Sequence, residues 1–334
     1  MCTNGMGKEG KEGGVQVEKI KKVSPQQKQQ KKIMRKKVWK QVRSHWQLYL
    51  LMLLPIIYIF VFKYAPMYGI LIGFKQYNAS KGVWGSPWVG LKWFRMFWES
   101  PQFDRLIGNT ITISLYNLLG GLIPPIILAI AINEMRIRPV KKVAQLITYM
   151  PHFLSVVVIT SMLQQILSHN GMVNNLLASL GLERISFLGK PELFPHIFVW
   201  SGVWQNAGYN AIIYIAALAG ISPELGEAAQ IDGANIWQRI WHIDIPGILP
   251  TAVILLIMGS ANVLNVGFEK IFLLQNDLNK RASDVISTYV YNIGLKNMEY
   301  SLATAIGLFQ SVVSLVVLFI VNKISKKVTE NSLW

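Results

Sequence analysis

Six long apolar stretches constrain this chain more than any other feature of its sequence. A helix of about 20 apolar residues crosses the roughly 30 Å hydrocarbon layer of a bilayer with its backbone polar groups satisfied internally. The hydrophobic content of 52% also exceeds the usual share in soluble domains. The sequence therefore predicts an all-α membrane protein with six transmembrane helices, at about 47–70, 106–132, 145–167, 196–220, 248–268 and 301–322.

Basic residues flank these spans unevenly and predict their orientation. Thirteen of the 33 Lys and Arg residues lie between Lys8 and Arg43, and smaller clusters occur at 136–142 and 323–327. Such clusters remain on the cytoplasmic side of a membrane, so both termini are expected there, as is the link between spans four and five. The net charge of +16 is then a membrane anchor, compatible with anionic lipid, and no nucleic-acid partner is expected.

Composition divides the chain into a tail, a membrane domain and a short end. Residues 1–45 are rich in Gly, Gln, Lys and Glu, which predicts a basic cytoplasmic tail that is partly disordered and is not a cleavable signal. Residues 46–327 form the predicted transmembrane domain, and residues 328–334 a cytoplasmic tail.

The segment 222–246 between spans four and five is too polar to cross a bilayer. Ser222 can cap a helix, and Pro223 suits its first turn because proline presets φ and lacks an N–H that would need a partner. Gly233 predicts a break and Pro246 an end. The segment is therefore predicted to be a helix, a break and a second helix on the membrane surface.

The second half of this segment has an apolar face formed by Ile236, Trp237, Ile240 and Trp241. Two interpretations are open. Tryptophans of an interfacial helix lie at the headgroup level of the bilayer. Alternatively, an amphipathic helix docks into a groove on a soluble partner.

Polar side chains within the spans need partners or a water-lined cavity. Hydrogen bonds between helices, worth about 1 kcal/mol each, explain any single one of them. As a set they predict a path for a neutral, hydroxyl-rich solute, since amides both donate and accept hydrogen bonds. No fixed charge lies deep in spans four and five, which argues against a proton relay. The path residues are predicted to be Asn206, Tyr209, Asn210, Asn262, Asn265 and Gln310.

Signatures of catalysis and of metal binding are not evident. The five histidines are scattered, Cys2 is the only cysteine, and His152 reads as a capping or packing residue. The sequence lacks the G-x-x-x-x-G-K-[ST] loop that cradles ATP phosphates. We therefore expect neither an enzyme nor a metal site in this chain.

Two short runs inside the 222–246 segment carry a family resemblance. Glu227-Ala228-Ala229 and Asp232-Gly233-Ala234, followed by Ile245-Pro246, resemble the EAA motif of permease subunits of ATP-driven importers. Further stretches, at 149–153, 208–220, 267–276, 284–295 and 303–309, resemble the carbohydrate permeases of the oligosaccharide and polysaccharide branch, which includes the alginate importer permease. The resemblance covers about residues 45–327.

The resemblance implies a MetI-like permease core in a bacterial cell membrane. Implied partners are a second homologous permease, an ATPase dimer that binds ATP and Mg, and an extracellular or periplasmic solute-binding protein that delivers the sugar. Glu227 would contact the ATPase groove, Ala228 and Ala229 would permit close approach, and Gly233 would form the turn. Asp232 would cap or pair locally. A permease for a non-sugar solute is the alternative, whereas a membrane enzyme or sensor lacks a reactive constellation.

Overall fold

The computed structural model describes residue 34, residue 37 and residues 39–329, so the predictions for the basic tail and for the end at 328–334 fall largely outside the described residues. Within the described part the chain is helical, and the β-type pairing there is an isolated bridge between Lys75 and Trp88. The predicted all-α fold is confirmed. The chain divides into two units, residues 1–68 and residues 69–334.

The first span is one uninterrupted run of helical residues, Trp46–Phe74. Helix α2 (Trp46–Ile59) passes into a π-helical turn (Phe60–Tyr64) and then a 3-10 stretch (Ala65–Phe74). The α2 helix has no buried residue, although its sequence is strongly apolar. An apolar helix with all sides exposed suits a lipid environment. After this span come the short helices α3 (Gly82–Gly85) and α4 (Lys92–Trp98).

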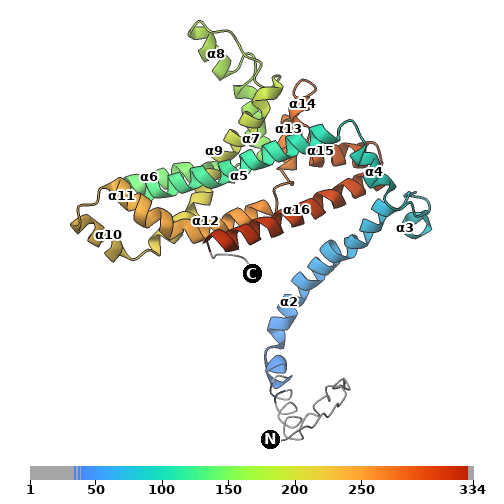
Figure 1. Cartoon of the computed structure of the whole chain (residues 1–334), viewed down its shortest axis with the longest axis horizontal. Coiled ribbons are helices and arrows are strands. Elements are labelled where there is room, and N and C mark those ends of the chain that lie inside the picture. Colours follow the sequence, from blue (N-terminus) through green and yellow to red (C-terminus); the bar gives the residue numbers. More distant parts are fainter. Residues whose placement is uncertain (1–33, 35–36, 38, 330–334) are drawn as a thin grey trace, which may run out of the picture. The chain divides into compact units, whose positions relative to one another are not determined.

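Four long helices form the frame of the second unit, and Figure 1 shows their arrangement. Helix α5 (Phe103–Asn133) packs along α9 (Phe194–Ala219), and α12 (Ile245–Ser260) packs along α16 (Tyr300–Thr329). The α9 helix also meets α6 closely at Gly208, where a Cβ atom would lie 2.0 Å from the Thr148 carbonyl oxygen. Only glycine permits that approach.

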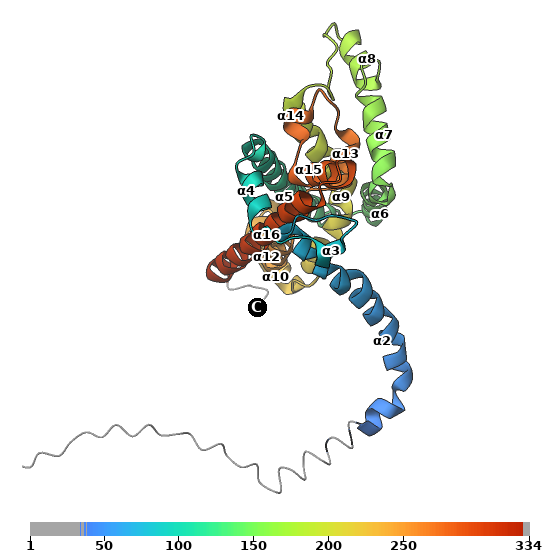
Figure 2. The ribbon, with the colours of Figure 1, turned by 90° about the vertical axis from the view of Figure 1, so that its right-hand side faces the viewer.

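The third predicted span is not a straight helix. Helix α6 (Arg138–Tyr149) continues as a 3-10 turn (Met150–Phe153), and the chain then bends by 98° into α7 (Val156–Ile166). Pro151 interrupts the helical ladder, and the Ser155 hydroxyl caps the new helix by accepting from Val158 N–H. Helix α8 (Met172–Ser179) extends beyond the end of α7 (Figure 2).

The fourth and fifth spans also differ in detail from the prediction. Helix α9 is followed by a bend of 72° into α10 (Pro223–Ile231). The fifth span runs from Ile236 to Ser260, earlier than the predicted 248–268. The first span, α5, the span Ile236–Ser260 and α16 are four helices long and apolar enough to cross a membrane. The number of candidate spans reaches the predicted six if each of the two bent pairs is one span.

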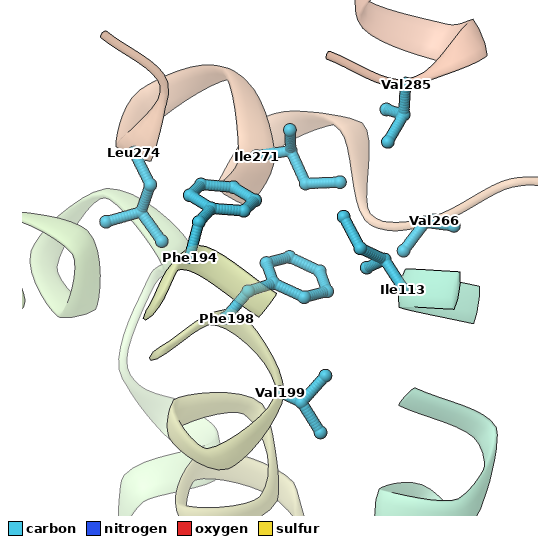
Figure 3. Packing of buried hydrophobic residues seen from close by; sticks show 8 residues of the cluster. All are labelled: Ile113, Phe194, Phe198, Val199, Val266, Ile271, Leu274 and Val285. Carbon is cyan, nitrogen blue, oxygen red and sulfur yellow. The ribbon is translucent and has the colours of Figure 1, made fainter. Parts of the chain in front are cut away.

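Residues after Ser260 leave the helix and return as short elements. Residues 261–267 are turns and irregular chain, followed by α13 (Phe268–Leu274), α14 (Lys280–Ser283), α15 (Ile286–Tyr291) and a π turn (Asn292–Lys296). A buried cluster joins these elements to α5 and α9 (Figure 3). Its members are Ile113, Phe194, Phe198, Val199, Val266, Ile271, Leu274 and Val285.

Candidate functional site

The EAA segment, residues 222–246, begins with an exposed helix. Ser222 occupies the N-cap position of α10 with Pro223 after it, as predicted, although the Ser222 side chain makes no capping hydrogen bond. The helix ends in a Schellman turn, in which Ala234 N–H donates to Ala229 O at 2.8 Å and Gly233 N–H to Gln230 O at 3.1 Å. Gly233 has a φ of +81° there, so the predicted break is present.

The second half of the EAA segment differs from the prediction. Asn235 and Gln238 form a capping box that starts α11 (Ile236–Arg239). The helix then continues through a π turn (Ile240–Asp244) into α12 as one span, Ile236–Ser260. The expected end at Pro246 is wrong, because Pro246 lies in the first turn of α12, where the missing N–H of proline is tolerated.

An ion pair ties the EAA segment to α5. Arg239 Nη2 donates to both carboxylate oxygens of Glu134, at 3.0 and 3.2 Å. Both side chains are about four-fifths buried, at 20% and 19% exposed. Asp244 lies within the same region, with its Oδ2 atom buried and unpaired. Sequence reasoning missed this contact because 105 residues separate its partners.

The predicted contact residues of the EAA segment lie at its surface. Glu227, Ala228, Asp232 and Gly233 are exposed, whereas Ala229 and Ala234 are half-buried. A shallow concavity of about 370 Å³ lies within the turn. It is lined by Ala229, Asp232, Gly233, Ala234, Gln238, Arg239, His242 and Ile243. Large apolar side chains are exposed beside it, including Ile231 and Trp237.

A cleft of about 340 Å³ lies between α5, α9, α12 and the irregular chain after α12. Its lining is more apolar than polar, but we call it the polar cleft because of the amides that it contains. Four amides line it: Asn117, Asn210, Asn262 and Asn265. Asn262 and Asn265 were predicted to lie within span five. The helix ends at Ser260, however, so both residues lie on irregular backbone. Irregular backbone at membrane depth is tolerated where it lines a cavity.

A second cleft of about 420 Å³ adjoins the first on the side of α16. It shares Asn262 and Asn265 and adds Gln310, Ser311 and Ser314. The Gln310 side chain donates to Leu264 O, so α16 holds the irregular chain that carries the two asparagines. These two clefts together contain four of the six predicted path residues.

Asn206 and Tyr209 do not line either cleft. They contact His152 at the bend between α6 and α7. The His152 ring stacks on the Tyr209 ring with centroids 3.8 Å apart, and its Nδ1 atom lies 3.0 Å from Asn206 Oδ1. His152 is therefore a packing residue, as expected, and Asn206 and Tyr209 hold the bend against α9.

Lys270 is a buried cation that sequence reasoning missed. It lies on α13 with 8% of its surface exposed, and its ammonium donates to Phe198 O at 3.2 Å. Burial lowers the pKa of Lys270 to about 8. The sequence signal was weak, because Lys270 follows the exposed Glu269 just beyond the predicted span. Among the described residues, no group of three His, Cys, Asp or Glu side chains forms a metal-ligand cluster.

Comparisons with known proteins agree with this architecture. The family described as "Binding-protein-dependent transport system inner membrane component" matches residues 121–330. "Protein LplB" of Bacillus subtilis strain 168 is 40% identical over 293 residues, covering 87% of this chain and 92% of LplB. The "Polygalacturonan/rhamnogalacturonan transport system permease protein YteP" of the same strain is 38% identical, covering 91% of this chain and 95% of YteP.

A solved structure gives the same relationship in three dimensions. A chain from a bacterial ABC transporter "involved in the import of the acidic polysaccharide alginate" has a TM-score of 0.81 and 41% identity. The match covers 88% of this chain and 99% of that one. The predicted permease resemblance and the MetI-like core are thereby confirmed. This multi-pass membrane protein belongs to the family of inner membrane components of binding-protein-dependent transport systems.

Proposed function

We propose that this permease subunit forms half of a path along which an ATP-driven importer moves an oligosaccharide into the cell. The observation that carries the proposal is the amide-lined cleft. Asn117, Asn210, Asn262 and Asn265 come from three separate parts of the chain and line one cavity between membrane helices. Each amide offers donors and an acceptor, which matches the alternating hydroxyl groups of a sugar.

The cargo class follows from the relatives. YteP carries polygalacturonan and rhamnogalacturonan in its name, and the alginate importer has been solved with a periplasmic protein bound to an alginate pentasaccharide. By analogy, an extracellular or periplasmic binding protein would deliver an oligosaccharide to this permease. A second homologous permease would supply the other half of the path.

The energy would come from a separate ATPase dimer, which binds ATP and Mg. We propose that α10 and the following turn dock into a groove on that dimer, with Glu227 as the polar contact. Support comes from the exposure of Glu227 and Ala228 and from the exposed Ile231 and Trp237, which leave an apolar surface for a partner. Closure of the ATPase dimer would move this segment as a rigid body, with both termini on the same cytoplasmic side.

Co-purification followed by reconstitution tests the proposal. The tagged chain is purified in mild detergent, and its partners are identified by mass spectrometry. We expect a second permease and an ATPase. The assembled complex, in proteoliposomes with its binding protein, should hydrolyse ATP faster when an oligosaccharide is added. A chain that purifies alone would contradict the proposal, as would a complex whose ATPase responds to amino acids but to no sugar.

A further inference from the structure

Lys270 carries its positive charge in a buried position, where the loss of hydration of a cation is unfavourable. It lies on α13 directly before Ile271, which belongs to the buried cluster of α5, α9 and α13 drawn in Figure 3. The ammonium lies 5.4 Å from the centre of the Phe198 ring. An ammonium taken from water into such surroundings loses hydration that one carbonyl oxygen and one ring face only partly replace.

No acidic side chain compensates this charge. The ion pairs formed by the described residues are Arg95–Glu99, Arg105–Asp284 and Arg239–Glu134, and none includes Lys270. The ammonium has three N–H donors, of which the structure assigns one, to Phe198 O. A buried cation that has no acidic partner among the described residues is a candidate for binding an anionic ligand.

The ammonium lies beside the polar cleft. A Cβ atom on Gly202 of α9 would be 3.6 Å from Lys270 Nζ and 3.9 Å from Asn117 Oδ1. Asn117 is one of the four amides that line the polar cleft, and Val266, which packs in the same buried cluster, lines it as well. Gly202 has no side chain to fill the space between the ammonium and Asn117. Lys270 does not itself line the cleft, but its positive potential reaches this end of the cleft, where Asn117 lies.

We infer that Lys270 is a specificity-determining residue that favours an oligosaccharide bearing carboxylates, such as one built of uronic acid residues, in the polar cleft. This inference rests on the proposed function and names the chemical class of its cargo. The four asparagines bond to hydroxyl groups of any sugar, whereas Lys270 distinguishes an acidic sugar from a neutral one by charge. A carboxylate that passes Asn117 gains a favourable interaction with the ammonium that a neutral sugar lacks.

The test compares two sugars that differ only in charge. The probes are a galacturonate pentasaccharide and its carboxyl-reduced neutral counterpart, with uptake measured in proteoliposomes that contain the full importer and its binding protein. Lys270→Met removes the charge, Lys270→Gln removes it but keeps a donor for Phe198 O, and Lys270→Arg retains it. Lys296→Met is the matched control, because Lys296 is exposed and lies over the rings of Phe272 and Tyr291.

We expect K270M and K270Q to reduce uptake of the acidic pentasaccharide about tenfold relative to wild type, while K270R and K296M retain at least half of it. Any uptake of the neutral pentasaccharide should change less than twofold. Unchanged acidic uptake in K270M or K270Q would overturn the inference, as would an equal loss with both sugars. If neither neutral variant assembles while K270R does, Lys270 is structural and the inference is also overturned.

The wild-type protein separates this inference from the proposed function. A wild-type importer that takes up the neutral pentasaccharide and rejects the acidic one contradicts the role of Lys270 but leaves oligosaccharide import standing. A wild-type importer that responds to no oligosaccharide of either charge contradicts both.

Discussion

The EAA segment and the polar cleft are built by different means. In the EAA segment each turn is encoded within a few residues: Pro223 starts a helix, Gly233 ends it with a φ of +81°, and Asn235 begins the next. The polar cleft instead collects Asn117, Asn210 and Asn262 from helices and chain far apart in the sequence. The first is a local structure exposed to a partner, and the second exists only when the whole unit is packed.

This difference has an energetic consequence. The first half of the EAA segment, α10, is exposed, whereas its second half continues into α12 and packs Ile240 and Ile245 against a buried cluster. A substitution in α10 can therefore weaken a partner contact without unfolding the membrane helices. The cleft lies against the close packing of α5 on α9 and of α12 on α16. Its polar residues can be altered individually only where they make no bond that holds the helices together.

The largest effect is expected in the exposed helix α10 of the EAA segment. Glu227→Lys reverses the charge of the predicted ATPase contact and should lower ATP-driven uptake by more than about 100-fold, because a like charge or an unpaired lysine would enter the docking groove. Membrane insertion and permease pairing should persist. Uptake by reconstituted importer and the amount of co-purified ATPase measure the two effects.

Glu224→Lys is the matched control for this variant. Glu224 lies on the same helix, one turn earlier, and is also exposed. We expect E224K to retain most of the uptake. Normal uptake by a stably inserted E227K protein would show that α10 is a surface helix rather than the coupling contact.

A smaller effect is expected where the EAA segment is tied to α5. Arg239→Ala leaves Glu134 partly buried without its partner, which should cost about 1–3 kcal/mol and loosen the link between the segment and the membrane helices. We expect a lower Tm in detergent and weaker stimulation of the ATPase by sugar. Differential scanning fluorimetry and the ATPase assay measure these changes.

A double-mutant cycle sharpens this test. Arg239→Glu combined with Glu134→Arg should recover part of the lost stability. Full recovery is not expected, because the new carboxylate at position 239 would lie in the region of the unpaired Asp244. Additive losses in the double variant would mean that the two residues do not act as a pair.

The sequence predicted much of the fold because the relevant signals are local or periodic. Hydropathy located the apolar stretches that form the four long helices and the two bent pairs, and Gly233 marked the turn of the EAA segment. The sequence could not predict the 98° bend of span three, because Pro151 and Ser155 are equally compatible with one continuous helix that contains a kink. It also placed Asn262 and Asn265 in a helix, although the chain is irregular there and is held by Gln310 from another span.

The candidate site was only partly accessible for a related reason. Listing amides in apolar spans found Asn210, which lines the cleft, and Asn206, which contacts His152, without separating them. Four residues separate the two on one helix, so periodicity assigns them to the same face. Which neighbour each one meets depends on the position of the α6–α7 bend, and that is set by tertiary packing. The burial of Lys270 has the same origin.

Asn210, which lines the polar cleft, and Asn206, which lies outside it on the same helix, offer a direct comparison. Asn210→Ala should raise the half-saturating sugar concentration about 3- to 10-fold, since one or two hydrogen bonds to the sugar are lost. Asn206→Ala should instead affect thermal stability, because it removes the contact with His152. Sugar titrations of the ATPase activity, with Tm measured for both variants, separate the two roles. A larger titration shift in N206A than in N210A would reverse this assignment.

The smallest effect concerns the charge of Lys270. Because burial lowers its pKa to about 8, the ammonium is mostly protonated at pH 7 and loses its proton as the pH rises through 8. The half-saturating concentration of an acidic pentasaccharide should therefore rise about two- to fourfold between pH 7 and pH 8.5. In Lys270→Arg it should stay constant, since a guanidinium remains charged over this range.

Other groups near Lys270 define the control for this pH experiment. Of the helices packed against α13, α7 has no titratable residue, and α15 contributes Tyr289 and Tyr291. Burial raises the pKa of Tyr289 still further above the tested range. On α9, the His196 ring is hydrogen-bonded to the Tyr116 hydroxyl. His196→Gln should keep the pH dependence, and its disappearance in that variant would assign the effect to the histidine instead of Lys270.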